Sequence, residues 1–328
     1  MTTVSYHETV KVLQDLPFAG NGPFARPDWF IRLEKAGYQP FVALARDGDE
    51  AIALPLAQGR GGLEALTNWY AFTWAPLTTR KAKRAKLLEA LARALKTRAA
   101  RIAMAKLPDE DGSATALEQA FRRAGWFVSR EACDTNHVLE IGGRTFAEYL
   151  ARRPGPLRTT LKRKARKVEI DIFQHFVIDN WQAYEEVYCE SWKPEEGDPP
   201  LLRAFAEAEG GAGRLRLGLA SHDGQVVAAQ FWTVENGTAY IHKLAHLESA
   251  RPLSAGTSLT AALLEHVIDR DRVTLVDFGT GDDPYKRDWM EQSRPRYRLT
   301  CWKPGNPANW PAIGRALART LVSHARRG

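Results

Sequence analysis

A segment dense in ionisable side chains, GTGDDPYK, follows a short apolar run late in the chain. Its two glycines permit sharp backbone turns, so Asp282 and Tyr285 could face one cleft. A carboxylate and a phenol can serve as base and acid, one taking a proton from an attacking group and the other protonating a leaving group. We therefore predict that Asp282 and Tyr285 are catalytic, with Asp282 as base or as anchor for a cationic group. Lys286 is predicted to bind substrate, the alternative being a salt bridge to a neighbouring aspartate.

Two upstream segments supply a second candidate base. Val226–Val234 and Thr238–Ala245 are rich in β-branched and aromatic residues and flank the turn sequence ENG, which predicts a β-hairpin. His242 could act as the base if its side chain faces the cleft. Lys243 would then point to the other face of the strand, because successive side chains alternate. The choice between Asp282 and His242 stays open, and Lys243 is predicted to bind substrate.

A helix start between the hairpin and the ionisable segment is a candidate anion site. The sequence LSAGTS opens a periodic helix whose first turn contains no acid. Unpaired amides and the positive end of the helix dipole coincide at such a start, and Gly256 allows close approach. The alternative is an ordinary helix start capped by Ser254 or Thr257. The residues predicted to bind a phosphate-bearing cofactor are Ser254, Ala255, Gly256, Thr257 and Ser258.

The order of these segments is hairpin, helix, apolar strand (Val273–Phe278) and polar loop. With the sequences VVAAQ, KLAH, LSAG and DFGTGDDPYK, it resembles the CelD/BcsL-type acyltransferases of the GNAT superfamily over roughly Phe146 to Trp302. FemAB-type transferases, built from two such domains, are more distant relations. The resemblance implies an α/β fold in which a mixed, largely antiparallel sheet is flanked by helices. It also implies acyl-CoA as co-substrate, an amine acceptor and no metal.

The first half of the chain repeats the same landmarks. The offset is 175 or 176 positions: 42–56 matches 217–231, 76–77 matches 252–253, and 87–89 matches 263–265. A constant offset predicts tandem domains of one fold. At the position equivalent to Gly256 the first copy has Arg80, which tolerates fewer turn conformations, so we expect this copy to have lost cofactor binding. The predicted domains are 1–141 (degenerate GNAT-like), 142–305 (catalytic) and 306–328 (amphipathic basic helix).

Several side chains outside these segments are candidates for acceptor binding. The aromatic run from Thr67 to Pro76 could bury its rings in the sheet, or could line a groove for an acyl chain, a long-chain base or a sugar. Three of its residues are predicted to bind substrate: Trp69, Tyr70 and Trp74. Glu190 and Trp192 are weaker candidates for holding an ammonium group. The acids that follow, at 195, 196 and 198, are expected to be solvated.

Charge and composition limit the location and the partners. The chain has 328 residues, 44% hydrophobic and 26% charged, and a formal net charge of +7. Basic runs at Lys81–Arg101 and Arg152–Lys167 are either solvated faces or attract CoA phosphates, anionic lipid or nucleic acid, with nucleic acid the least expected. The C-terminal apolar positions 310, 313, 317 and 321 either pack on the protein or lie on an anionic membrane. Without a secretory signal or an apolar run long enough to span a membrane, we expect a cytoplasmic protein, the alternative being a peripheral protein on the inner face of the cytoplasmic membrane.

The three cysteines, at 133, 189 and 301, are widely spaced and include no Cys-x-x-Cys pair. We expect them to be reduced and structural, without a metal. Together with the resemblance, these observations predict an acyl-CoA-dependent N-acyltransferase that forms an amide on a cell-envelope amine. A long-chain sphingoid base is the favoured acceptor, as in bacterial ceramide synthases. The alternatives are an amino sugar of an exopolysaccharide as acceptor, a FemAB-like transferase that uses aminoacyl-tRNA, and a non-catalytic binding module.

Overall fold

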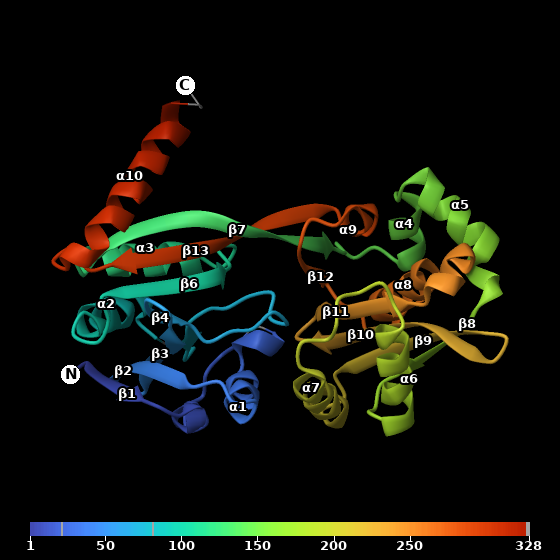
Figure 1. Cartoon of the computed structure of the whole chain (residues 1–328). Coiled ribbons are helices and arrows are strands. Elements are labelled where there is room, and N and C mark those ends of the chain that lie inside the picture. Colours follow the sequence, from blue (N-terminus) through green and yellow to red (C-terminus); the bar gives the residue numbers. More distant parts are fainter. Residues whose placement is uncertain (21, 81, 326–328) are drawn as a thin grey trace. The chain divides into compact units, whose positions relative to one another are not determined.

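The computed structural model describes residues 1–20, 22–80 and 82–325, with side chains described up to residue 319 (Figure 1). The chain divides into two compact units. Unit 1 comprises Met1–Thr135 and Pro295–Gly328, and unit 2 comprises Asn136–Arg294. Two strands, β7 (Phe127–Glu140) and β13 (Gln292–Trp302), contribute residues to both units.

Unit 1 is built on a mixed sheet. Antiparallel ladders join β1 to β2, β2 to β3, β3 to β4 and to β5, and β6 to β13, while β4 and β6 are parallel. The other strands are β1 (Thr3–His7), β2 (Pro40–Asp47), β3 (Glu50–Gly59), β4 (Gly62–Ala65), β5 (Leu77–Thr78) and β6 (Arg101–Leu107). The helices are α1 (Pro27–Lys35), α2 (Arg84–Leu95), α3 (Ser113–Arg123) and α10 (Trp310–Ala325). Helix α2 packs on β2 and against α3, burying leucines at positions 87, 88, 91 and 95.

Unit 2 holds the segments expected to carry chemistry. Its sheet order is β7, β12, β11, β10, β9, β8, antiparallel apart from the parallel pair β11 and β12. The strands are β8 (Glu169–Phe173), β9 (Leu215–His222), β10 (Gln225–Glu235), β11 (Thr238–His246) and β12 (Leu275–Thr280). The helices are α4 (Phe146–Ala151), α5 (Gly155–Lys164), α6 (Ile178–Cys189), α7 (Pro199–Gly211), α8 (Ala255–Glu265) and α9 (Pro284–Trp289). A π-helical turn, His266–Arg270, continues α8.

Helices cover both faces of this sheet because neighbouring residues of β10 point in opposite directions. Phe231 packs on Trp181 of α6 and on Phe205 of α7. The side chain of Gln230, one residue earlier, instead donates to the Gly256 carbonyl on α8. The strands alternate accordingly between a face against α6 and α7 and a face against α8.

The predicted elements of the second half form, and so does the repeat in the first. Both β2–β3 and β9–β10 are antiparallel hairpins, and β2 and β9 begin at positions 40 and 215. This arrangement confirms an α/β fold with a mixed sheet flanked by helices. The compact units divide the chain at other positions than the sequence analysis did. Residues 295–302 cluster with unit 1 because the end of β13 pairs with β6, and 136–140 cluster with unit 2 because they pair with β12.

The C-terminal helix α10 belongs to unit 1 and leaves apolar side chains in solvent. Trp310 and Leu317 are 61% and 50% exposed, while Ala316 is buried. The predicted apolar position Leu321 lies outside the described side chains. Among the described residues, none of the helices has the length and apolar character needed to cross a membrane.

Candidate functional site

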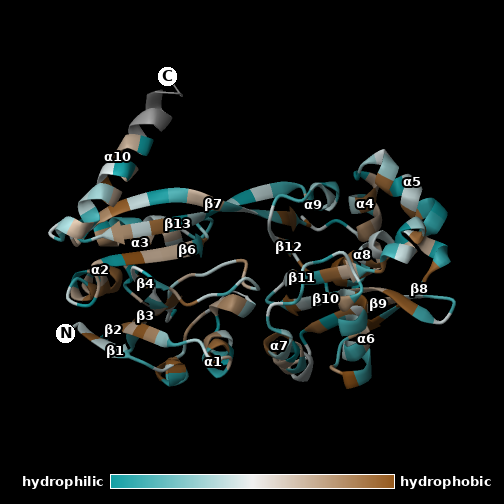
Figure 2. Cartoon of the chain, viewed as in Figure 1, coloured by the Kyte–Doolittle hydropathy of each residue, from teal (hydrophilic) through white to brown (hydrophobic). Residues whose placement is uncertain are grey.

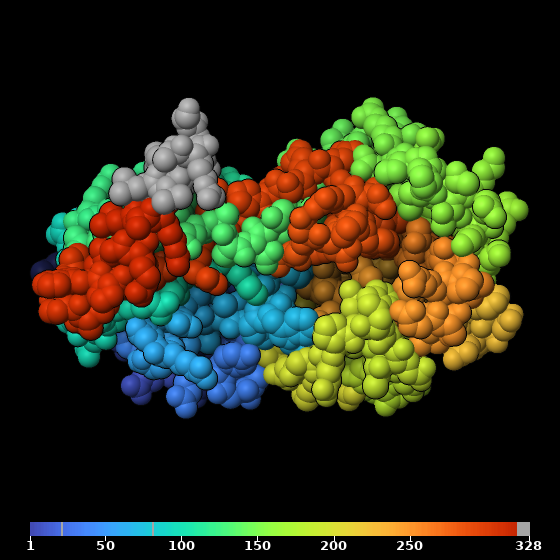
Figure 3. All heavy atoms as spheres, turned by 45° about the horizontal axis from the view of Figure 1, so that its top comes forward, coloured from blue at the N-terminus to red at the C-terminus, as the bar shows by residue number. Residues whose placement is uncertain are grey.

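Helix α8 begins at Ala255, after Ser254 in a left-handed conformation with φ of 54°. The Ser254 side chain does not cap the helix; its hydroxyl instead accepts a hydrogen bond from the Lys164 ammonium at 3.2 Å. Lys164 ends α5, a helix with no acid that packs against α8. In Figure 3 the green surface that contains α5 adjoins an orange surface of unit 2. In Figure 2, α5 carries many hydrophilic residues, whereas α8 is mostly apolar or neutral. The start of α8 is therefore an acid-free amide cluster with a cation beside it.

A cavity of about 500 Å³ opens at this helix start. It brings together residues that the sequence analysis had placed in three separate motifs. The predicted residues that line it are Trp192, Ser254, Ala255, Gly256, Thr257, Tyr285 and Lys286, and its other lining residues include Lys193, Leu244, His246, Arg251, Phe278 and Asp283. Ser258, the remaining predicted cofactor-binding residue, is buried in α8 and is absent from this lining among the described residues.

The cavity lies where two parallel strands separate. The ladder between β11 and β12 ends with Tyr240 opposite Asp277, although both strands continue. Beyond this point Leu244 of β11 and Phe278 of β12 both line the cavity. The end of this pairing leaves a gap between β11 and β12 beside the cavity.

Gly256 lies close to the His246 ring, a contact that the sequence did not reveal. A Cβ built at this position would lie 3.2 Å from Cδ2 of the ring, so a side chain here requires the imidazole to shift by a few tenths of an ångström. Its Nδ1 is 3.0 Å from the Leu247 carbonyl, and since a carbonyl only accepts, Nδ1 carries a proton. In the neutral ring Nε2 is then left as an acceptor.

Tyr285 and Lys286 reach the cavity from α9. The Tyr285 hydroxyl is 2.7 Å from Oγ1 of Thr260, and burial raises the pKa of the phenol to about 12. The Lys286 ammonium donates to the Thr280 carbonyl and lies 5.4 Å from the centre of the Phe278 ring. Asp283 accepts from the Tyr285 amide at 2.9 Å and thereby caps α9.

Asp282 is not part of this cavity. Its carboxylate is 59% exposed and forms an ion pair with Arg287, and the hydrogen bond from this guanidinium lowers the pKa of Asp282. It also lies 3.5 Å from Nε2 of His137, a buried histidine whose pKa is lowered by burial. A carboxylate with a lowered pKa is a weaker base, so the geometry and the charge both disfavour the predicted role of Asp282.

The predicted alternation of His242 and Lys243 is interrupted by a bulge. Phe231 is paired with Lys243 but Trp232 with Ile241, so His242 is an extra residue in β11. His242 bonds to Thr233 at 2.8 Å and packs on Phe205, while Lys243 contacts Tyr188. Both side chains therefore face α6 and α7, and the expectation that they would point to opposite faces is wrong. The histidine on the face against α8 is His246.

Lys243 ends in a buried ion pair. Its ammonium is 2.8 Å from the Glu196 carboxylate, and both side chains are 10% exposed. Burial lowers the pKa of Lys243 to about 8. Glu196 was expected to be solvated; the α6–α7 connection instead folds it onto Lys243, while Glu190 is exposed at the end of α6. Trp192 is exposed and lies against the His246 ring, with 4.2 Å between ring centres.

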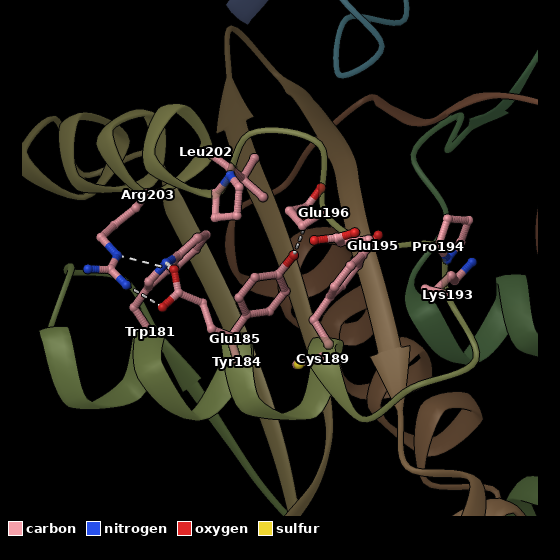
Figure 4. Close-up of a pocket in the computed structure, with 12 residues that line it drawn as sticks. Trp181, Tyr184, Glu185, Cys189, Lys193, Pro194, Glu195, Glu196, Leu202 and Arg203 are labelled. Atoms are coloured by element: carbon pink, nitrogen blue, oxygen red, sulfur yellow. Dashed lines mark hydrogen bonds and ion pairs between the residues drawn. The ribbon is translucent and has the colours of Figure 1, made fainter. Parts of the chain in front are cut away.

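A second cavity of about 520 Å³ lies between α6, α7 and their connection (Figure 4). Its walls are mainly aromatic and aliphatic, and Tyr184 and Glu196 point toward one another across it, with 3.5 Å between hydroxyl and carboxylate. Lys193 lines this cavity and also the one at the start of α8. The lining residues drawn in Figure 4 include Trp181, Tyr184, Glu185, Cys189, Leu202 and Arg203.

The aromatic candidates of the first half lie in unit 1. Trp74 is fully buried, and its indole N–H donates to the Pro55 carbonyl at 3.1 Å. Tyr70 is also buried, whereas Trp69 is half exposed and contacts the Tyr70 ring in a tilted arrangement with 5.0 Å between ring centres. Trp74 and Tyr70 are thus core residues of unit 1. Among the described residues, no group of three or more His, Cys, Asp and Glu side chains could hold a metal ion.

Comparison with known proteins agrees with this geometry. Residues 144–287, which make up most of unit 2, match the family described as acetyltransferase (GNAT) domain. Unit 2 has the GNAT fold. No curated protein matches the sequence. The CelD/BcsL subtype and the likeness to ceramide synthases have no counterpart in these matches.

Solved structures similar to the whole chain extend this result. FemX is 10% identical, with a TM-score of 0.65 and coverage of 95% of this chain and 100% of that one. The C-terminal domain (DUF2156) of a proposed lysylphosphatidylglycerol synthetase from Agrobacterium fabrum is 16% identical, with a TM-score of 0.60 and coverage of 96% and 95%. A tandem GNAT protein from the clavulanic acid pathway is 14% identical, with a TM-score of 0.54 and coverage of 93% and 100%. At these identities the likeness concerns the fold alone.

Proposed function

We propose that unit 2 binds an acyl-CoA thioester in the cavity at the start of α8 and transfers its acyl group to an amine. The observation that carries the proposal is the joint lining of this cavity by the first turn of α8 and by Tyr285. The first turn of α8 would offer backbone amides to a pyrophosphate. Tyr285 would offer a phenol to the sulfur that leaves as a thiolate.

The charges around the cavity support an anionic donor. Arg251, Lys193 and Lys286 line it, whereas Asp283 is the one carboxylate among the described lining residues. Lys164 adds a further cation beside Ser254. Such an excess of positive charge attracts phosphate groups. The gap between β11 and β12 would take the extended arm that links the pyrophosphate to the thioester, with Leu244 and Phe278 as its apolar walls.

We assign the base to His246. An attacking amine must lose a proton, and a neutral imidazole with an unprotonated Nε2 can accept it. His246 lines the cavity with Tyr285, whereas Asp282 is ion-paired in solvent and His242 lies on the other face of the sheet. Tyr285 would protonate the thiolate, as the sequence predicted.

For the acceptor we propose an amine with a long apolar body, of which a sphingoid base remains the first example. The cavity between α6 and α7 supports this choice, because aromatic and aliphatic side chains dominate its walls and it adjoins the donor cavity at Lys193. The exposed carboxylate of Glu195, which also lines this cavity, suits an ammonium group. The exposed apolar side chains of α10 and the cations of α5 would hold the protein at an anionic membrane where such an acceptor resides.

One observation favours a second candidate, a transferase that takes its acyl group from aminoacyl-tRNA. Helix α5 and the turn after it expose cations at 158, 162, 163, 166 and 167 with no acid among them. A basic stripe of this kind could grip RNA phosphates beside the donor cavity. CoA and tRNA are therefore the two donors to compare.

The decisive experiment measures donor binding and then transfer. Calorimetry with CoA, palmitoyl-CoA and total tRNA identifies the donor, and Gly256→Leu should abolish CoA binding because its side chain would meet the His246 ring. Mass spectrometry then follows amide formation on sphinganine, hexadecylamine and glucosamine with acyl-CoA of several lengths. Amide on sphinganine supports the proposal, and amide on glucosamine alone would replace the acceptor. Binding of tRNA without CoA would favour the second candidate, and binding without any transfer would indicate a binding module.

A further inference from the structure

Behind Tyr285 a chain of buried polar groups runs from the cavity into the core of unit 2. Thr260 Oγ1 is 2.7 Å from the Tyr285 hydroxyl, 2.9 Å from the Gly256 carbonyl and 2.7 Å from Nε2 of Gln230. Gln230 Nε2 also lies 3.1 Å from the Gly256 carbonyl. The far side of Gln230 is closed by Trp232, whose Nε1 is 2.9 Å from Gln230 Oε1. Gln230 and Thr260 are fully buried.

The direction of each hydrogen bond in this chain follows from the chemistry of its groups. The indole N–H of Trp232 can only donate, so the atom that it contacts must be the carbonyl oxygen of Gln230. The amide nitrogen of Gln230 therefore faces α8, where its two hydrogens go to Thr260 Oγ1 and to the Gly256 carbonyl. Gln230 is fixed in orientation and always donates to Thr260.

Only the hydroxyl proton of Thr260 then has two alternative acceptors. This proton can go to the Gly256 carbonyl, in which case Tyr285 must donate to Thr260 and offers only its lone pairs to the cavity. Alternatively, the proton of Thr260 goes to the Tyr285 oxygen, and the phenol proton is free to point into the cavity. The Gly256 carbonyl keeps its bond from Gln230 in both states. The two states differ by rotation of two hydroxyl groups, without movement of heavy atoms.

We propose that Thr260, held by Gln230, is a positioning residue that turns its hydroxyl from Gly256 to Tyr285 and so makes Tyr285 the acid of the transfer. This inference rests on the proposed function. In the step, the Tyr285 O–H bond breaks and an S–H bond forms on the departing CoA thiolate. The Thr260 O–H then donates to the phenolate oxygen. The proton that the attacking amine loses to His246 passes through solvent back to Tyr285, so that acyl-CoA and amine give amide and free CoA.

The Thr260 hydroxyl matters because the phenol of Tyr285 is buried. Burial raises the pKa of Tyr285 to about 12, and the bond with Thr260 acts in the opposite direction. A phenolate in such a place forms only if a donor meets the new charge. Two side chains oppose this rise in the pKa of Tyr285 by hydrogen bonding to its hydroxyl, Thr260 with the larger effect and Trp289 with the smaller. Without Thr260, the phenolate would lose the stronger of these two contacts.

The test compares Thr260→Val, which removes the hydroxyl at nearly constant shape, with Thr260→Ser, which keeps it. Thr274→Val is the matched control, because the Thr274 hydroxyl also donates to a backbone carbonyl, at 3.2 Å from Gly237, but on the exposed surface of unit 2. A hydrogen bond to a charged group predicts a kcat about 10- to 100-fold lower in Thr260→Val, with unchanged KM for palmitoyl-CoA. Thr260→Ser should restore most of the loss, and Thr274→Val should match the wild type.

A double variant separates this role from simple packing. If Thr260 acts through Tyr285, Thr260→Val should cause almost no further loss in a Tyr285→Phe background. An equal further loss in that background would overturn the inference, as would a Thr260→Val kcat within about twofold of the control. In both cases the proposed function would still stand if Tyr285→Phe has a lowered kcat. A wild-type protein that transfers no acyl group from any acyl-CoA would overturn both.

Discussion

At the scale of single residues, the histidine that reaches the cavity differs from the one that the sequence suggested. His246 lines the cavity with Tyr285, while His242 lies among Phe205 and Phe231 on the opposite face of the sheet. We expect His246→Gln to lower kcat by about 100-fold or more, because it removes the proton acceptor. His242→Gln should retain most of the turnover. Steady-state kinetics across pH would check this, and equal losses in both variants would argue against His246 as the base.

Substitutions of Asp282 and Tyr285 should differ in their effect on turnover. Asp282→Asn should change turnover by less than about threefold, because its charge is solvated and already paired with Arg287. Tyr285→Phe should lower turnover by about 100- to 10,000-fold while CoA affinity and melting temperature stay near those of the wild type. Turnover with a saturating amine is the measurement. A large loss in Asp282→Asn would restore the original assignment of Asp282.

At the scale of elements, the α6–α7 connection is fixed to β11 by Glu196 and Lys243. Removal of one partner of a buried pair costs about 3 to 5 kcal/mol while the remaining charge persists. Glu196→Gln should therefore destabilise the protein at pH 7, because the Lys243 ammonium is left buried without its carboxylate. The pKa of Lys243 would fall below about 8, its value in the folded wild type.

The loss of unfolding free energy in Glu196→Gln should depend on pH with a defined sign. The pKa of Lys243 is lower in the folded chain than its ordinary value of 10.5, so the unfolded chain binds more protons and stability rises with pH between about 8 and 10.5. In Glu196→Gln the rise begins at lower pH, so the difference from wild type shrinks as pH rises toward about 8 and stays at its smaller value above it. Urea unfolding at pH 6.5 and 9 measures it. A difference that stays constant with pH would contradict this account.

At the scale of the whole molecule, the two repeats are expected to differ in binding. Calorimetry should find one CoA per chain, because the sequence repeat aligns Gly256, in the first turn of α8, with Arg80, which lies in a turn before α2. A cavity of about 370 Å³ does lie beside the start of α2, lined by residues that include Arg80 and Arg84. Arg80→Gly restores the glycine of the second copy. If this variant still binds one CoA per chain, other features of unit 1 also prevent CoA binding. Two sites in the wild type would show that the first copy still binds.

Association with membranes is the last prediction for the whole chain. The exposed cations of α5 and the exposed Trp310 and Leu317 of α10 should bind vesicles containing phosphatidylglycerol and release them at high salt. The charge interaction is screened over about 8 Å at physiological ionic strength. Replacement of Lys162 and Arg163 by glutamine should weaken flotation, and Trp310→Gln should weaken the part that survives high salt. If the fraction of protein that floats with the vesicles does not depend on lipid charge or on salt, the result would contradict a membrane role for α5.

The sequence by itself determined the features that depend on neighbouring residues. The hairpin around Asn236, the helix start at Ala255, the polar loop after β12 and the repeated hairpin of the first half all follow from turn residues and periodicity, which act over a few positions.

Tertiary structure alone decided which side chains meet. One extra residue in β11 reverses the alternation after His242, which places His246 rather than His242 against α8, and a bulge leaves no clear mark in the sequence. The partners Gln230, Thr260 and Tyr285 are brought together from β10, α8 and α9, so their hydrogen bonds depend on the packing of three elements. Burial of Glu196 has the same origin: only packing of the α6–α7 connection on β11 removes this carboxylate from water.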